Sequence, residues 1–458
     1  MSSFVMTSEE WFPSLPFLIG WLVSASCRRR VDLRPWIRVI GVGASILSLG
    51  LAWDPALPSL SENGGQVARL LTIAYALISV VGFAAVPHRV ISRSDFATVF
   101  FASAACMVLF RVANPILFVL FLLMVTISVT RLVLEERACL MFDSLNSERI
   151  TTYIVYRILA WIALIGFIAS FGFDWLAFPS IDRPFDAEVR WLPSSCLVIS
   201  MLAFLGLFPF HSWLPLFLGA PRLNIFIPLL TMTIGVTFFL RLFLPLYPRL
   251  THSVSLTLTI NCAIGLIYVA LLLFGEHRLK RIGGYVVMSH LGFMVLAGTS
   301  AVGSSGLIPV ELDTLNLLFA SGGLVLVLSC LSSRFGLSGV TSASGLASTY
   351  PELGLCFLVC ALSLVGFPGT IGFISEELLF QGAFAHQVQL VPVIVIALAL
   401  NGYSCFRLFA RSFFGSPSYP NAVALPLVGR ERVCILIITG FILINGFVPD
   451  LVMKFAVR

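Results

Sequence analysis

Long apolar segments recur along the whole chain, and they restrict its fold more than any other feature. Stretches of about 18 or more residues with few charges are long enough to cross the hydrocarbon core of a bilayer, and the sequence contains about fourteen of them. Inside lipid, the backbone polar groups of each stretch must be satisfied within the segment, which a helix achieves. We therefore predict an all-α, polytopic membrane protein with about fourteen transmembrane helices.

The composition and the loop lengths favour one membrane domain. Of the 458 residues, 59% are hydrophobic and 11% are charged, whereas about a quarter of the residues of a soluble domain are charged. The longest predicted connections comprise residues 174–191 and 416–432. We therefore predict a single membrane domain over residues 1–458, without a nucleotide-binding or redox domain of its own.

Basic residues are distributed unevenly between the predicted loops. When the loops are numbered alternately, one face carries about twice as many basic residues as the other, and the positive-inside rule makes that face cytoplasmic. An even number of helices then places both termini on the non-cytoplasmic side of the cell inner (plasma) membrane. The net charge of +6 reflects this topology, so we expect a lipid bilayer and no nucleic acid as a partner.

The sequence contains none of the common signatures of catalytic or metal chemistry. Its ten cysteines include no C-x-x-C pair, and a buried cysteine behaves as a small hydrophobic residue. No G-x-G-x-x-G fingerprint, P-loop or H-E-x-x-H motif is present. We expect no metal site, no cofactor and no catalytic residue in this chain, so any redox turnover would belong to partner subunits.

Two of the apolar segments are interrupted by helix-breaking residues. Pro209 and Pro215 bracket a histidine and a tryptophan in the first, and Pro368 and Gly369 stand in the second. Paired interruptions in corresponding places are typical of transporters built from inverted repeats. We predict broken helices 7 and 12 within two inverted five-helix repeats. The first repeat region comprises residues 110–250 and the second 253–413, with flanking helices in 1–109 and 414–458.

Three motifs carry a resemblance to a known family. Residues 208–215 read Phe-Pro-Phe-His-Ser-Trp-Leu-Pro and are followed by Ala220-Pro221, residues 279–293 read LKRIGGYVVMSHLGF, and residues 366–376 read GFPGTIGFISE. Together they resemble the antiporter-like membrane subunits of respiratory complex I (NADH-quinone oxidoreductase chains 4 and 5), Mrp antiporters, membrane-bound hydrogenases and an inorganic-carbon uptake system. The resemblance covers roughly residues 192–449. It implies proton transport within a larger complex of membrane and peripheral subunits.

The family places a string of charged residues at the bilayer midplane: a Glu in the fifth helix, a Lys in the seventh, a Lys or His in the eighth, and a Lys or Glu in the twelfth. Aligning the motifs puts the seventh-helix Lys at Phe204 and the fifth-helix Glu near Leu123 or Met124. The eighth helix, residues 224–240, contains neither His nor Lys. Only Glu376 keeps its charge, and the whole chain contains two lysines, Lys280 and Lys454.

The resemblance and the residue chemistry together predict a proton path through Glu376, Glu377, His290, His211 and Lys280. The two glutamates differ by about 100° around a helix, so at most one can face a narrow channel. A histidine can shuttle protons near neutral pH. Each residue also has a structural explanation: the glutamates can be solvated at the surface, and the histidines can donate to a neighbouring carbonyl.

Two arginines near helix ends have several possible roles. Arg157 can pair with Glu135, Glu136 or Asp143, or its side chain can extend to the membrane interface, as is common for arginines at such positions. We expect Arg241 to lie at the interface in the same way.

The predicted function is that of an antiporter-like, proton-conducting subunit, translocating ions in a complex I-type NADH:quinone oxidoreductase or in an inorganic-carbon uptake system. Two alternatives remain open. The chain can be a non-pumping structural paralogue that lost its midplane charges, or a secondary transporter of a small solute, because many transporters contain broken helices.

Overall fold

The fold was determined as a computed structural model. The structure describes residues 11–26, 34–53, 64–85, 93–112, 114–139, 144–171, 190–217, 226–277, 279–301, 308–342, 344–415 and 426–450, with some side chains near the ends of these ranges left aside. The helices of these ranges form two compact units. Unit 1 comprises Met1–Leu205 and Leu229–Ser255, and unit 2 comprises Gly206–Pro228 and Leu256–Val457.

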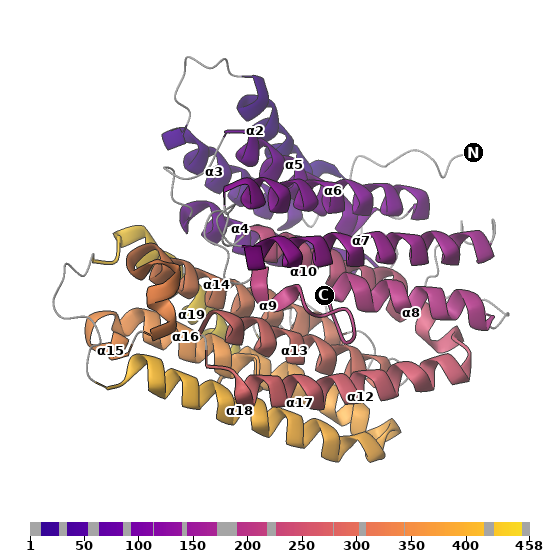
Figure 1. Ribbon diagram of the computed structural model, residues 1–458. Helices are drawn as coiled ribbons and strands as arrows, with labels where there is room; N and C mark the ends of the chain where they lie inside the picture. Colours follow the sequence, from indigo (N-terminus) through magenta and orange to yellow (C-terminus); the bar gives the residue numbers. More distant parts are fainter. Residues whose placement is uncertain are drawn as a thin grey trace. The chain divides into compact units, whose positions relative to one another are not determined.

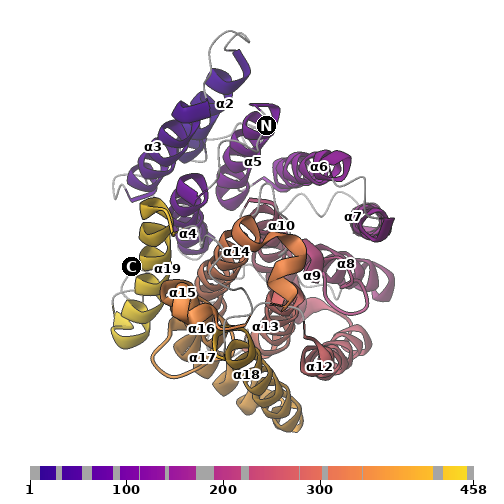
Figure 2. The same cartoon turned by 60° about the vertical axis from the view of Figure 1, so that its left-hand side comes forward.

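Unit 1 is built from helices of the first half of the chain. Their bounds are α2 (Leu15–Ser26), α3 (Arg34–Trp53), α4 (Gly64–Ala85), α5 (Arg93–Arg111), α6 (Pro115–Cys139), α7 (Ser144–Phe171), α8 (Trp191–Leu205), most of α10 (Phe226–Phe238), the π-helical turn η4 (Phe239–Phe243), α11 (Leu244–Leu246) and the 3-10 turns η2 (Phe12–Ser14) and η5 (Tyr247–Arg249). Figures 1 and 2 both show α7 beside α8 in this unit.

Unit 2 contains the second half of the chain and the short helix that follows the first proline break. Its helices are α9 (Leu214–Phe217), most of α12 (His252–Gly275), α13 (Leu279–Ala301), α14 (Ile308–Ser342), α15 (Leu346–Thr349), α16 (Pro351–Ser363), α17 (Ile371–His386), the 3-10 turn η6 (Val388–Leu390), α18 (Val391–Phe413) and α19 (Gly429–Phe447). The described elements are thus helical throughout, and the predicted all-α class is confirmed.

Many of these helices have the length and composition of membrane spans. Within the described ranges, nine spans are long and apolar enough to cross a bilayer, and four shorter apolar helices, among them α8 and α16, accompany them. The protein is therefore a multi-pass membrane protein.

Two helices form the interior of unit 2. In the apolar windows of α13 and α14, 94% of the residues are buried, against 28% in that of α18. Figure 2 shows α13 lying among α12, α14, α17 and α18. A polar side chain on α13 or α14 is therefore enclosed by protein, where it needs a partner.

Both predicted interruptions are non-helical stretches between two helices. In the first, α8 ends at Leu205 and α9 begins at Leu214. Pro209 lies between them after a cis peptide bond, and Pro215 is the second residue of α9. In the second, α16 ends at Ser363 and α17 begins at Ile371, with Pro368 and Gly369 between them. We call these stretches the first break (residues 206–213) and the second break (residues 364–370).

Candidate functional site

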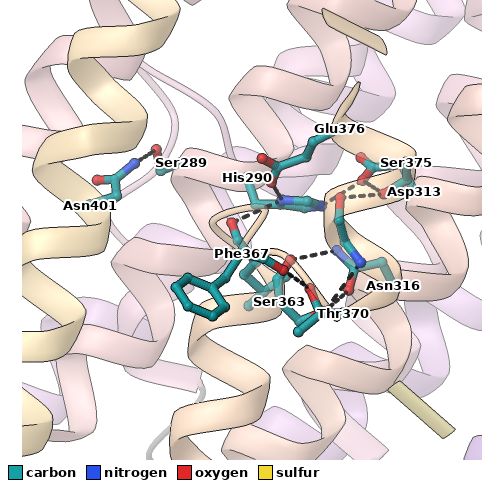
Figure 3. A network of polar contacts seen from close by, with 12 residues as sticks. Ser289, His290, Asp313, Asn316, Ser363, Phe367, Thr370, Ser375, Glu376 and Asn401 are labelled. Atoms are coloured by element: carbon teal, nitrogen blue, oxygen red, sulfur yellow. Dashed lines mark hydrogen bonds and ion pairs between the residues drawn. The ribbon is translucent and has the colours of Figure 1, made fainter. Parts of the chain in front are cut away.

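Three ionisable side chains from three helices meet in the interior of unit 2. His290 of α13 lies between Asp313 of α14 and Glu376 of α17 (Figure 3). Its Nε2 atom is 3.1 Å from Asp313 Oδ1, and its Nδ1 atom is 3.3 Å from Glu376 Oε1. The side chains of His290 and Asp313 have no exposed surface, and that of Glu376 is 7% exposed. We refer to these three residues as the buried cluster.

The local sequence explains why these side chains turn inward. His290 lies midway along the apolar span Arg281–Ser300, and Asp313 lies in the second turn of α14. Glu376 reaches the cluster because α17 starts afresh at Ile371 after the second break, which places the carboxylate in its second turn. A continuous helix through residues 364–370 would set a different rotation for Glu376.

The second break leaves backbone carbonyls without helical partners, and polar side chains next to the cluster satisfy them. His290 Nδ1 is 3.2 Å from the Leu364 carbonyl oxygen. Asn316 donates from Nδ2 to the Ser363 carbonyl at 3.1 Å, and the Ser363 hydroxyl donates to Asn316 Oδ1 at 2.6 Å. Freed backbone groups at membrane depth are tolerated when protein re-satisfies them in this way.

Close packing fixes the two carboxylates of the cluster. The Ser375 hydroxyl donates to Asp313 Oδ1 at 2.9 Å and so ties α17 to α14. Glu376 packs directly on Gly366, because a Cβ atom there would lie 2.1 Å from Glu376 Oε2. Gly366 also has a φ of +68°, a left-handed conformation that favours glycine. Gly366 thus gives both the turn and the space that the carboxylate requires.

This arrangement can hold or release a proton with little movement of heavy atoms. An imidazole carries one or two N–H donors, and each carboxylate here accepts when ionised and donates when protonated. With both carboxylates ionised and His290 protonated, the cluster has a net charge of −1, and one more proton makes it neutral. Buried charges persist only when they are paired and hydrogen-bonded, so the three groups depend on one another.

The five predicted path residues do not lie together in the structure. Glu376 and His290 belong to the cluster, whereas Glu377 is exposed and accepts a hydrogen bond from Gln381 Nε2 at 3.3 Å. His211 lies in the first break, where its ring stacks on Phe208 at a centroid distance of 5.9 Å and meets Tyr268 edge-on at 5.2 Å. Lys280 is the second residue of α13, and its side chain lies outside the described set.

Sequence reasoning missed Asp313 and Asn316. Neither residue was assigned a role from the sequence, whereas α14 begins at Ile308 and carries both of them inside the helix. A signal was available, because Glu311 and Asp313 directly precede a long apolar run, and a carboxylate at membrane depth suggests an ion site. Within the described part of the chain, no group of His, Cys, Asp and Glu residues has the arrangement of a metal site.

The two arginines both bind backbone carbonyls of another helix. Arg157 is 3% exposed, and its Nη1 atom donates to the Phe204 carbonyl of α8 at 2.9 Å, so the predicted interfacial position is wrong. Arg241, in the π-helical turn η4, donates to the carbonyls of Phe110 and Val112 at the C-terminal end of α5. Both guanidinium groups bind the carbonyls of a helix terminus, which water alone cannot satisfy inside a membrane. The side chains of Glu136 and Asp143, suggested as partners of Arg157, lie outside the described set.

The fold and the buried cluster define a multi-pass helical membrane protein with ionisable groups beside a broken helix. The profile of the family described as "NADH:quinone oxidoreductase/Mrp antiporter, TM" matches residues 114–401, more than half of the chain. The chain belongs to this family, as the sequence motifs predicted.

Curated relatives match more than half of the chain. An "NADH-quinone oxidoreductase subunit M" of Mycobacterium tuberculosis is 29% identical over 249 residues, which are 54% of this chain and 45% of the relative. The subunit of the same name from Rhodobacter capsulatus is 25% identical over 287 residues, 60% of this chain and 55% of the relative. The chain thus spans about half the length of the curated relatives it matches.

Solved structures share the fold over almost the whole chain. A chain of "Respiratory complex I from Thermus thermophilus with bound NADH" has a TM-score of 0.79 at 20% identity and covers 98% of this chain and 97% of its own length. A chain of the "Mrp complex from Dietzia sp. DQ12-45-1b" has a TM-score of 0.76 at 16% identity, covering 98% and 96%. The fold is therefore that of the antiporter-like subunits.

Proposed function

We propose that this chain is an antiporter-like, proton-conducting membrane subunit of a multi-subunit complex. The observation that carries the proposal is the imidazole of His290 between the buried carboxylates of Asp313 and Glu376. Ionisable groups at membrane depth are costly, and they are found where they pair and line an ion path. Family membership and the shared fold support the same function.

In the proposed path, protons arrive from the cytoplasmic side near His211 and Lys280 and reach His290, which passes them to Glu376. Asp313 extends the predicted path as a second acceptor on the opposite edge of the imidazole. Histidine suits the central position because its two nitrogens can take up a proton on one side and release it on the other. Glu377, being exposed, would lie beside the path and outside it.

The assembly is proposed from the names of the relatives. The matching curated proteins are called subunits of NADH-quinone oxidoreductases, which favours a complex I-type partner set over the inorganic-carbon uptake system. The redox reaction would take place on other subunits, and this chain would supply a proton route through the membrane.

The finer architecture is proposed on the same basis. Fourteen membrane crossings result from adding the nine long spans, the four shorter apolar helices and α19. In this count α8 and α9 together form one broken helix, and α16 and α17 form another. These would be helices 7 and 12 of two inverted five-helix repeats, 110–250 and 253–413, within one membrane domain. One of the divisions between the two units falls after Ser255, close to the proposed boundary of the repeats. Fourteen crossings leave both termini on the non-cytoplasmic side of the inner membrane.

A non-pumping structural paralogue is the second candidate. The observation that favours it is the apolar character of Phe204, Leu123 and Met124 at the positions where the family carries charges. A chain that only holds its neighbours together would need no buried cluster, so the two functions differ in their response to changes at Glu376.

The test is proton flux through the purified, reconstituted complex. We expect Glu376→Gln to lower the flux by about a hundredfold, the scale on which a single proton-transfer group acts. Glu377→Gln is the matched control, since it removes the neighbouring, exposed carboxylate and should leave the flux unchanged. Equal flux in the wild type and in Glu376→Gln, at equal amounts of assembled complex, would favour the structural paralogue.

A further inference from the structure

The two broken helices end in the same way. At the end of α8, Phe204 stands two residues before Gly206, which has a φ of +71°. At the end of α16, the C-cap residue Leu364 stands two residues before Gly366, which has a φ of +68°. The last carbonyls of a helix have no partner within it. At both breaks a basic side chain from another helix binds the carbonyl two residues before the left-handed glycine.

At the first break this side chain is an arginine held on several sides. Arg157 of α7 donates from Nη1 to the Phe204 carbonyl at 2.9 Å, and its Cζ atom lies 5.0 Å from the centre of the Tyr153 ring and 5.7 Å from that of Phe204. A guanidinium group stays protonated at any physiological pH. The first cap is therefore present at every pH that the protein meets.

At the second break the corresponding side chain is a histidine with competing partners. The Nδ1 atom of His290 is 3.2 Å from the Leu364 carbonyl and 3.3 Å from Glu376 Oε1, while Nε2 faces Asp313. The carbonyl can only accept, so it is satisfied only while Nδ1 carries a proton. When His290 is neutral with its proton on Nε2, the Leu364 carbonyl faces a lone pair and loses its donor.

We propose that Arg157 and His290 cap the two broken helices in different ways: Arg157 is a positioning residue that caps the first permanently, and His290, besides its place in the proposed relay, caps the second only while Nδ1 is protonated. The second break alone would then loosen and tighten as protons pass. The cap at the first break requires no proton movement. The conditional cap at the second break rests on the proposed function, because it assumes that the buried cluster exchanges protons.

The charged neighbours of the two caps differ in kind. Arg157 has Tyr153 on its own helix, and it lines the same groove as Arg131 and Glu135 of α6, which pair with each other at 3.0 Å. The described residues of α8 add no carboxylate or basic group. Around His290, α14 supplies Asp313 and α17 supplies Glu376, while α18 supplies the neutral Asn401, which donates to Ser289.

Hydrogen exchange of backbone amides, followed by mass spectrometry on the assembled complex, tests this difference. Rates are measured from mildly acidic to clearly basic pH, because the two neighbouring carboxylates favour the protonated imidazole, and they are corrected for the intrinsic pH dependence of exchange. In the wild type we expect protection near residues 204–208 to be constant with pH, and protection near residues 364–368 to fall as pH rises. The expected change at the second break is about tenfold or more, as for a lost hydrogen bond to a charged donor.

Two substitutions of Arg157 test whether the chemistry of the capping side chain sets the pH dependence of protection at the first break. Arg157→His should lose protection at the first break at a lower pH than Arg157→Lys, because the ordinary pKa of a histidine is about 6.5 and that of a lysine about 10.4. A purely structural role for Arg157 predicts a uniform loss of protection in both variants with no pH dependence. If Arg157→His fails to assemble, the comparison of the two breaks in the wild type still decides.

The proposal is overturned if the first break of the wild type changes with pH, if the second does not, or if assembled Arg157→His stays independent of pH. The experiment needs no proton flux. Unchanged flux in Glu376→Gln together with the expected exchange pattern would reject the proposed function and leave the two caps in place.

Discussion

Gly366→Ala should disable the cluster without altering any of its ionisable groups. An added Cβ atom at residue 366 would lie 2.1 Å from Glu376 Oε2 and 2.8 Å from its Cδ atom. Ordinary contact begins at 3.4 Å, so the carboxylate must retreat by about 1.3 Å. Its 3.3 Å contact with His290 Nδ1 would then be lost. A left-handed φ also costs a residue other than glycine about 1 to 2 kcal/mol.

We expect this substitution to lower proton flux in proteoliposomes by about a hundredfold, because misplacing a reacting group by about 1 Å costs on that scale. Gly440→Ala is the matched control: the residue lies in α19, where an added Cβ atom meets nothing within 4 Å. Flux is divided by the amount of assembled complex to separate misplacement of Glu376 from loss of protein. Wild-type flux in assembled Gly366→Ala would refute the idea that the position of Glu376 limits proton transfer.

Three further substitutions test separate parts of the structure. Asp313→Asn keeps the shape of the side chain but removes its charge and its ability to take up a proton beside His290, so flux should fall at least about tenfold; unchanged flux would exclude Asp313 from the path. Asn316→Ala removes two hydrogen bonds to Ser363 and leaves its carbonyl without that donor, which should destabilise the subunit by about 2 to 4 kcal/mol in thermal unfolding. Arg334→Met breaks the largely buried ion pair with Glu431 that ties α14 to α19. It should lower the free energy of unfolding by about 3 to 5 kcal/mol, measured as a lower melting temperature. A change below about 1 kcal/mol would mean that the pair is screened by solvent.

The sequence predicted the features that depend on composition and on short motifs. The apolar runs gave the helical membrane fold, and proline and glycine gave both breaks, because these residues limit the local backbone directly. The motif around residues 366–376 led to Glu376. The angle of about 100° between neighbouring residues led to the expectation that only one of Glu376 and Glu377 faces inward.

The contacts between distant helices could not be predicted in the same way. Whether His290 meets a carboxylate depends on the rotation of α13, α14 and α17 against one another, which packing sets. Asp313 was missed because helix boundaries are uncertain by several residues, and α14 already begins at Ile308, before the apolar run that follows Asp313. Arg157 was misplaced because the sequence put it near a helix end, whereas it lies midway along α7 and binds a carbonyl of another helix.

A double-mutant cycle on proton flux tests the central claim, that His290 and Glu376 act as one relay. Flux is measured in proteoliposomes for the wild type, His290→Gln, Glu376→Gln and the double variant. If the two residues act in one path, each single change stops it, and the double variant should be no slower than the slower single variant. Losses that multiply in the double variant would show two independent routes and would contradict the account.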